Sequence, residues 1–137
     1  MAGKILLEVV TPEKQLLSQE VDEVIAPGSE GEFGVLPGHC HFLSTLRIGE
    51  LRYRVGDRTN HMAILWGYAE VTPHKVTVMA EIAEKAEDID VERAQAAVAK
   101  AEQRLKAGGL PSEVKEAEIS LEKACLRMKL AQRAQKS

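Results

Sequence analysis

The chain has no long hydrophobic run. None of its 137 residues belongs to an uninterrupted apolar stretch that approaches the roughly 20 residues of a membrane-spanning helix. Near the start, the short run Ile5–Leu7 is stopped by Glu8, which is unlike the apolar segment of a signal peptide. We therefore expect neither a membrane span nor a secretory leader.

Aromatic and cysteine residues are also scarce. Aromatics make up 4% of the chain and hydrophobic residues as a whole 45%, so we expect a folded protein whose core consists mainly of Val, Ile, Leu and Ala. The two cysteines, Cys40 and Cys125, are far apart in the sequence. Two isolated cysteines are typical of free thiols in a reducing compartment rather than of a disulfide framework.

Positive charge is not in excess. The formal net charge of −3 argues against general binding to nucleic acid. Residues 1–88 contain 8 basic and 14 acidic residues, whereas residues 89–137 contain 10 basic and 7 acidic ones. The opposite charge balance of the two parts indicates two modules with different partners.

The first module, residues 1–87, has the pattern of a β-protein. Leu51–Val55 alternates apolar and basic residues, as in a half-buried strand, and the apolar run Met62–Trp66 is typical of a strand buried on both faces. Gly67 interrupts that run before a further expected strand, Tyr68–Thr72. Short segments of this kind, separated by Gly and Pro, predict an antiparallel β-sandwich or barrel.

The second module, residues 88–137, has helical periodicity. Apolar residues recur at steps of three and four along two stretches, which are Val91, Ala94, Val98, Ala101 and Leu105, and then Val114, Ala117, Leu121, Ala124, Met128 and Ala131. Each stripe predicts an amphipathic helix. Because Gly108 and Gly109 separate the stripes, we expect an antiparallel α-helical hairpin. The two modules together predict an α+β protein.

The ends and the composition of these helices add two predictions. Asp88 or Asp90 is suited to cap the first helix and Ser112 the second, since short polar side chains accept hydrogen bonds from the free N–H groups of a helix start. The stripes are rich in alanine, which buries little apolar area, and burial contributes only roughly 25 cal/mol per Å². We therefore expect a hairpin that is marginally stable alone and able to change neighbours.

The stretch Pro27–His39 is expected to form a presented loop. Its thirteen residues include four glycines and two prolines, so its backbone path is constrained. Two carboxylates, Glu30 and Glu32, lie in its turn-prone part. This composition predicts a loop with an acidic tip that contacts a partner.

The triplet His39-Cys40-His41 allows the alternatives of a metal site and of a reactive thiol. Adjacent residues of a strand point to opposite faces, so the three side chains are not expected to converge as a structural zinc ion requires. A His next to Cys40 in sequence is also not by itself a positioned base. An ordinary structural role is therefore the favoured interpretation.

The charged residues of the second module leave two interpretations open. Asp90 and Arg93 suit ordinary helix capping, but free N–H groups beside an arginine also suit a bound anion such as a phosphate. Lys100, Lys123 and Arg127 lie further along the two expected helices and can face the same side. The basic C-terminal stretch either forms a solvated face or docks on an acidic partner surface.

The motif Gly31–His39, which follows an acidic Gly-Ser-Glu, resembles that of the epsilon subunits of F-type ATP synthases. The resemblance covers the whole chain, because an acid-tipped loop and a β-rich half are followed by an Ala-rich hairpin that opens with Ile-Asp-x-x-Arg-Ala. It implies a ten-stranded β-sandwich at the foot of the rotor. It also implies a non-catalytic subunit that couples the catalytic head to the c-ring during proton-driven ATP synthesis and restrains ATP hydrolysis through the hairpin.

The resemblance implies the partners as well. The sandwich would contact the gamma subunit and the c-ring, the latter through Glu30, Gly31 and Glu32 with His39 nearby. The hairpin would reach the alpha and beta subunits, and its contact with beta would involve Lys123, Arg127, Lys129 and Arg133. The protein would lie peripherally on the cytoplasmic side of a bacterial inner membrane, in preference to a plastid thylakoid, and would be held there only by the complex.

No cofactor is required by the resemblance, but ATP is a regulatory ligand of the hairpin in some bacterial members. The residues that match this nucleotide site are Ile89, Asp90, Arg93, Ala94 and Arg127. Two further arginines of the family stand here as Lys100 and Lys123, and lysine lacks the planar fork that binds phosphate through two hydrogen bonds. Weak ATP binding, or none, is the expectation.

Two alternatives belong to other functional classes. One is a free-standing β-sandwich adaptor with a helical interaction arm, which would not travel with membranes. The other is an enzyme that uses Cys40 and His41, which would require an unusually reactive thiol. The order and spacing of the motifs over the whole chain favour the rotor subunit.

Overall fold

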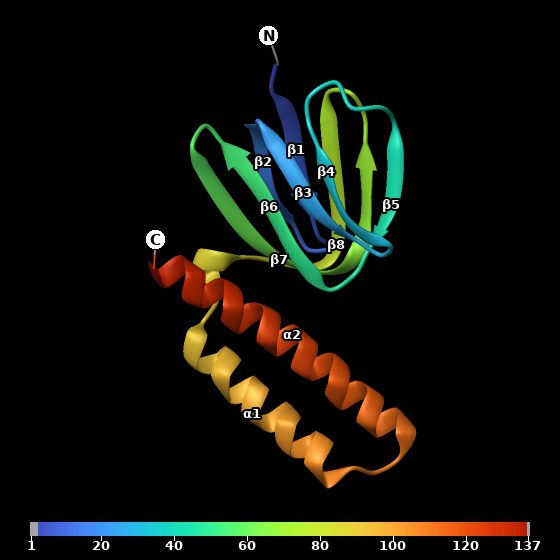
Figure 1. The fold of residues 1–137 in the computed structure, drawn as a ribbon, viewed down its shortest axis with the longest axis vertical. Coiled ribbons are helices and arrows are strands. Elements are labelled where there is room, and N and C mark those ends of the chain that lie inside the picture. Colours follow the sequence, from blue (N-terminus) through green and yellow to red (C-terminus); the bar gives the residue numbers. More distant parts are fainter. Residues whose placement is uncertain (1–2, 137) are drawn as a thin grey trace. The chain divides into compact units, whose positions relative to one another are not determined.

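The computed structural model describes residues 3–136, which form eight β-strands, one short 3-10 helix and two α-helices (Figure 1). The strands are β1 (Ile5–Val10), β2 (Gln15–Val21), β3 (Glu23–Gly28), β4 (Gly31–Val35), β5 (Phe42–Leu46), β6 (Gly49–Val55), β7 (Arg58–Val71) and β8 (Lys75–Lys85). The helical elements are η1 (Ala86–Asp88), α1 (Val91–Ala107) and α2 (Pro111–Lys136). The chain divides into two compact units, Met1–Glu84 and Lys85–Ser137.

The first unit is the predicted β-sandwich, with two corrections. Its strands are joined in the order β2-β1-β8-β7-β5-β3-β4, and β6 pairs with β3 and β7. The sandwich is not wholly antiparallel, because β1 and β8 run parallel, with Leu6 opposite Lys75. The described residues contain eight strands rather than the ten that the family resemblance implies.

The strand β7 accounts for one strand of this difference. It was expected to break at Gly67, but it continues and changes its neighbour there: Arg58–Ile64 pairs with β6, and Gly67–Val71 pairs with β5. Gly67 has a φ of 145°, and a Cβ at this position would lie 2.1 Å from the carbonyl oxygen of Met79. The glycine therefore lets β7 pass close to the backbone of Met79 and continue as one strand, rather than marking the end of one strand and the start of another.

The sandwich core follows from strand alternation. Along β1, Ile5, Leu7 and Val9 are fully buried while the residues between them are half-exposed. The core consists mainly of branched aliphatic side chains, as the composition predicts, and Tyr53 is the aromatic residue that it contains among the described residues. The run 62–65 is buried at every position, as predicted, but Trp66, which the prediction included, is exposed.

The second unit is the predicted helical hairpin. The residues buried most completely along its stripes are alanines spaced seven apart, namely Ala94 and Ala101 on α1 and Ala117, Ala124 and Ala131 on α2. The larger stripe residues beside them are half-buried. Small side chains at the helix contact let the two backbones approach closely, but they bury little area.

The helix ends agree with the sequence in one case and differ in the other. The side chain of Asp90 caps α1, because its Oδ1 accepts a hydrogen bond of 3.1 Å from the backbone N–H of Arg93. The predicted cap of the second helix was wrong. α2 begins at Pro111, so Ser112 already lies in its first turn, and proline is favoured there because its missing N–H would have had no helical partner.

Candidate functional site

The acidic tip lies at the turn between β3 and β4. Gly28 pairs with Gly31 across the hairpin, so Ser29 and Glu30 form a two-residue turn. Gly31 has a φ of 137°, which favours glycine, and a Cβ on Gly28 would lie 2.6 Å from the carbonyl oxygen of Gly31. The prediction of one presented loop over Pro27–His39 is therefore corrected: Gly31–Val35 forms β4, and the glycines serve the tight turn of a β-hairpin.

The end of β5 and the residue that follows it, Arg47, hold this turn in place. The backbone N–H of Ser29 donates to the carbonyl of Thr45 at 2.9 Å, and Thr45 Oγ1 donates to Ser29 Oγ at 2.8 Å. Arg47 donates from its backbone N–H to Pro27 at 3.0 Å and from Nε to the carbonyl of Gly28 at 3.2 Å. These four hydrogen bonds hold the tip far more firmly than a loop without such bonds would be held.

The two carboxylates of the tip have different surroundings. Glu30 is exposed and makes no ion pair with any described residue. Glu32 accepts a hydrogen bond of 2.9 Å from Arg52 Nη2, while Nη1 of the same guanidinium donates to Glu50 at 2.9 Å. Hydrogen bonds to Glu50 and then Glu32 raise the pKa of Arg52 above its ordinary value. The tip therefore carries one open and one paired carboxylate.

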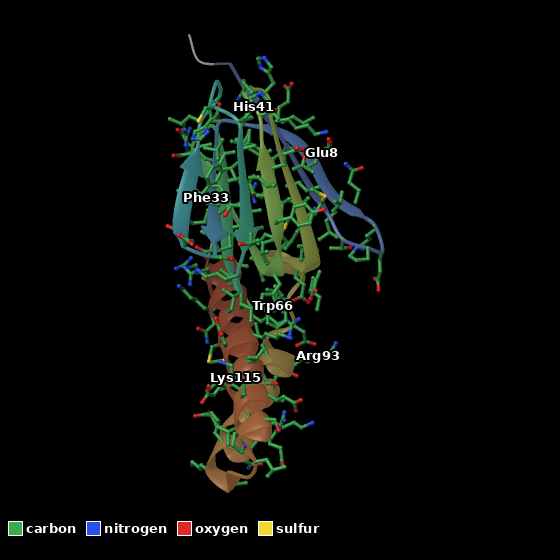
Figure 2. The ribbon with its side chains drawn as sticks, turned by 90° about the vertical axis from the view of Figure 1, so that its right-hand side faces the viewer. Glu8, Phe33, His41, Trp66, Arg93 and Lys115 are labelled. Atoms are coloured by element: carbon green, nitrogen blue, oxygen red, sulfur yellow. The ribbon has the colours of Figure 1, made fainter. Side chains whose placement is uncertain are left out.

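The structure does not bring His39 to this tip. Glu30 precedes β4 and His39 follows it, so the length of a five-residue strand, about 14 Å between its end residues, separates the two. The turn that holds His39 is attached elsewhere, because Gly38 N–H donates to the carbonyl of Pro73 at 2.8 Å. In Figure 2, Phe33 lies along the sandwich and His41 lies at one end of it. The expectation that His39 lies near Glu30 was wrong.

The triplet around Cys40 forms local contacts. His39 Nδ1 lies 2.9 Å from the carbonyl oxygen of Cys40 and 3.9 Å from its Sγ. Both cysteines are exposed free thiols. In the part of the chain that the structure describes, no group of three or more His, Cys, Asp or Glu side chains is placed to hold a metal ion.

The residues predicted to bind a nucleotide divide into two places. Asp90 uses its carboxylate to cap α1, which is the ordinary interpretation of this motif, and Arg93 is exposed (Figure 2). Arg127 instead lines a groove of about 250 Å³ between α1 and α2, together with Lys100, Lys123 and Arg104. Ile89, Asp90, Arg93 and Ala94 are not among the lining residues.

The groove has the charge for an anion but not the size for a whole nucleotide. Four cationic side chains line it, and one of them, Arg104, lies 3.7 Å from Glu116. Its volume of about 250 Å³ is below the roughly 300–1,000 Å³ of pockets that enclose small ligands. A phosphate group fits such a space and charge better than a complete ATP molecule does.

The four basic residues predicted to contact a beta subunit do not share one surface. Lys123 and Arg127 are four residues apart and half-buried beside the groove. Lys129 and Arg133 are also four residues apart but exposed. On a helix, residues four apart share a face, whereas residues two apart, such as Arg127 and Lys129, do not. The set forms two basic pairs.

Two sequence families match this chain, one for each half. Residues 4–86 match the family described as ATP synthase, Delta/Epsilon chain, beta-sandwich domain, and residues 87–132 match the ATP synthase, Delta/Epsilon chain, long alpha-helix domain. The chain is 53% identical to the ATP synthase epsilon chain of Syntrophobacter fumaroxidans, over 97% of this chain and 99% of that protein.

The chain belongs to the ATP synthase epsilon chain family. The epsilon chain of Geobacter metallireducens is a further relative, 52% identical over 96% of each chain. This membership confirms the assignment made from the sequence: the protein is an epsilon chain, a non-catalytic subunit of ATP synthase, and the adaptor and thiol-enzyme alternatives are set aside.

Solved structures share the epsilon-chain fold at low sequence identity. A chain of the Euglena gracilis mitochondrial ATP synthase superposes with a TM-score of 0.79 at 24% identity, over 98% of this chain and 82% of that one. A chain of the Tetrahymena thermophila mitochondrial ATP synthase gives a TM-score of 0.61 at 14% identity, over 95% and 98% of the two chains. In the described part of this epsilon chain, no helix is long and apolar enough to cross a membrane.

Sequence reasoning missed the residues that support the acidic tip of this epsilon chain. Thr45 and Arg47 hold the turn, and Arg52 binds Glu32 from a position 20 residues away. The alternation of Leu51–Val55 correctly placed Arg52 on an outward face. It contained no signal for the carboxylate that the arginine would meet, because strand register decides such pairs.

Proposed function

We propose that this chain couples rotation of the c-ring to the catalytic head of an ATP synthase and that its hairpin restrains ATP hydrolysis. The observation that carries the proposal is the match of both halves, in order, to the two domains of delta/epsilon chains. Relatives about half identical over nearly their full length support the same assignment. The sandwich, residues 1–87, is the rotor foot that binds gamma and the c-ring, and residues 88–137 are the regulatory hairpin.

The c-ring contact of this proposal is the tip formed by Glu30, Gly31 and Glu32. The tip is exposed, acidic and held rigidly by Thr45 and Arg47, so it can dock without first becoming ordered. His39 lies beyond the other end of β4 and stays a separate prediction, since one contact would have to span the length of that strand to include it.

The regulatory part of the proposal rests on the composition of the hairpin. Its helices meet through alanines, so little apolar area holds them in one arrangement. The exposed pair Lys129 and Arg133 suits an acidic segment of the beta subunit, and the pair Lys123 and Arg127 suits a phosphate in the groove. ATP is thus an optional regulatory ligand in this proposal and not a cofactor.

The cellular place follows from the complex. Relatives from bacteria such as Syntrophobacter and Geobacter support a bacterial ATP synthase, so the chain would lie at the cytoplasmic side of the inner membrane, peripherally and through its partners. The alpha and beta subunits, gamma and the c-ring are the partners proposed.

The test is a titration of an ATP synthase complex stripped of this subunit with the purified chain. We expect tight binding and slower ATP hydrolysis. In K129Q/R133Q we expect binding to persist and inhibition to weaken, because the sandwich is unchanged; K106Q/K115Q, which removes two other exposed hairpin charges, is the control. Absence of binding would overturn the proposal, and binding without inhibition would leave only the coupling role.

The nucleotide part has its own measurement. Calorimetry with ATP should give heat that is lost in R127A and kept in R93A if the groove holds the phosphates, because only Arg127 lines it. Equal loss of heat in both variants would mean that the start of α1 is also part of the binding site. If the unaltered protein gives no heat, ATP is removed from the proposal.

A further inference from the structure

We propose that Arg52 is a positioning residue for the partner contact of the acidic tip. It fixes one oxygen of Glu32 and leaves the other oxygen for a hydrogen-bond donor of the partner. This inference rests on the proposed c-ring contact and deepens it, because it distinguishes the tasks of the two carboxylates that the sequence presents as equivalent.

The geometry places Arg52 behind the tip. In the sheet, Glu32 is level with Pro27 and Arg52 is level with Ile25, so the arginine on β6 reaches across β3 to the carboxylate on β4. Its Nη2 lies 2.9 Å from Glu32 Oε1. Glu32 Oε2 makes no hydrogen bond with a described residue, and the side chain is 47% exposed. A fixed carboxylate with one open oxygen is prepared for a donor.

A buried carboxylate fixes the arginine in turn. Arg52 Nη1 lies 2.9 Å from Oε1 of Glu50, whose side chain is only 7% exposed. The other oxygen of Glu50 lies 3.3 Å from Nδ1 of His61, on β7. A buried carboxylate is stabilised by a cation close by, so swinging the guanidinium out to the partner would cost Glu50 the hydrogen bond from Arg52.

Glu50 also preserves the charge of the tip. Arg52 with Glu32 alone would be a neutral pair, which attracts a cationic partner weakly. Because Arg52 is shared by Glu32 and Glu50, the three groups together keep one negative charge, and Glu30 adds another. The partner that fits is therefore a polar segment with cationic or amide donors, and its binding should weaken as salt rises.

The test measures binding of full-length variants to an ATP synthase complex that lacks this subunit, at several salt concentrations. We expect R52Q to bind about tenfold more weakly, since an unsupported Glu side chain must be ordered on binding. R52K should recover part of the loss, because one ammonium can reach Glu32 but cannot replace the fork. E50Q should bind with a weaker salt dependence, because the remaining pair is neutral.

The matched control is R54Q. Arg54 lies two residues along the same strand, is also partly exposed and pairs with Asp22 and Glu23, away from Glu32. A role of Arg52 in sandwich stability alone would lower the melting temperature in R52Q and leave affinity and salt dependence like those of R54Q, which would overturn the inference. If R52Q does not fold, R52K and E50Q decide in the same way.

E32Q separates this inference from the proposed function. Weaker binding of E32Q with unchanged binding of R52Q and R52K would keep the tip contact and overturn the positioning role. Unchanged binding of E32Q and of E30Q would overturn the contact itself, and the positioning role with it. Weaker binding of E32Q, R52Q and, to a lesser degree, R52K is the expected result.

Discussion

The sandwich and the hairpin are held together by different kinds of side chain. In the sandwich, large aliphatic residues such as Leu51, Met62 and Ile64 are fully buried in one core. In the two helices of the hairpin, Leu130 is fully buried, but the other buried residues among those that the structure describes are alanines, namely Ala94, Ala101, Ala117, Ala124 and Ala131. The amount of apolar surface removed from water per residue is therefore much greater in the sandwich, and burial is the main stabilising contribution in both.

Because of this difference, we expect the sandwich to be more rigid than the hairpin. A core of large side chains gives a unit that keeps one shape under load, which a coupling element requires. A contact between alanines buries little apolar surface. Separating the helices from one another or from a neighbour therefore costs little free energy. The composition of each core is thus matched to the role proposed for its region.

The largest effect is expected from a cavity in the sandwich. Leu51→Ala should reduce the free energy of unfolding by about 2–5 kcal/mol, because it removes a fully buried side chain from a packed core. Thermal unfolding of the sandwich checks this, with Leu43→Ala, at an exposed leucine on β5, as the control. Equal effects of the two changes would contradict the core described here.

A medium effect is expected from overfilling the hairpin. Ala124→Leu should destabilise the contact between α1 and α2 by about 1–3 kcal/mol, because the close approach of the helices leaves no room for a larger side chain. Hydrogen exchange resolved by region should show faster exchange in the two helices and little change in the sandwich. Ala96→Leu, at an exposed position of α1, is the control. Faster exchange throughout the chain would contradict the expectation that the two regions unfold independently.

The smallest effect is expected from a charge in the sandwich. A hydrogen bond from Lys4, then one from the Gly56 N–H, lowers the pKa of Asp22, and such a group stabilises the fold above its unfolded pKa. That contribution is lost as the pH falls through the lowered folded value. Asp22→Asn should therefore melt slightly below the unaltered protein at pH 7 and equal to it in strong acid. A difference that grows in acid would contradict the sign.

Much of the fold could be predicted because local patterns decide it. The alternation in Leu51–Val55 and the apolar run after it gave the strands, and steps of three and four gave both helices. The turn at Gly108–Gly109 was also read correctly. The errors lie where the sequence has no local signal: the parallel pairing of β1 with β8, and the continuation of β7 through Gly67 by a change of partner.

The candidate site was predictable in its residues but not in its grouping. Glu30 lies on an exposed turn and Glu32 at the start of β4, but His39, which the family resemblance implied to be nearby, lies beyond the other end of that strand. Four basic residues of α2 were treated as one surface, whereas the helix turns them into two pairs. Proximity along a strand or a helix does not mean proximity in space, since a strand extends and a helix rotates.

The sequence by itself determined the class of each half, the family, the tight glycine turn and the alanine contact of the hairpin, because these depend on residue type and short-range periodicity. Only the tertiary structure decided which charges meet. Arg52 binds Glu32 because β6, β3 and β4 lie side by side in one register, whereas Glu50 is two residues away on β6 itself. Register is set by the packing of all the strands together, and a shift of one residue would turn each of these side chains to the opposite face.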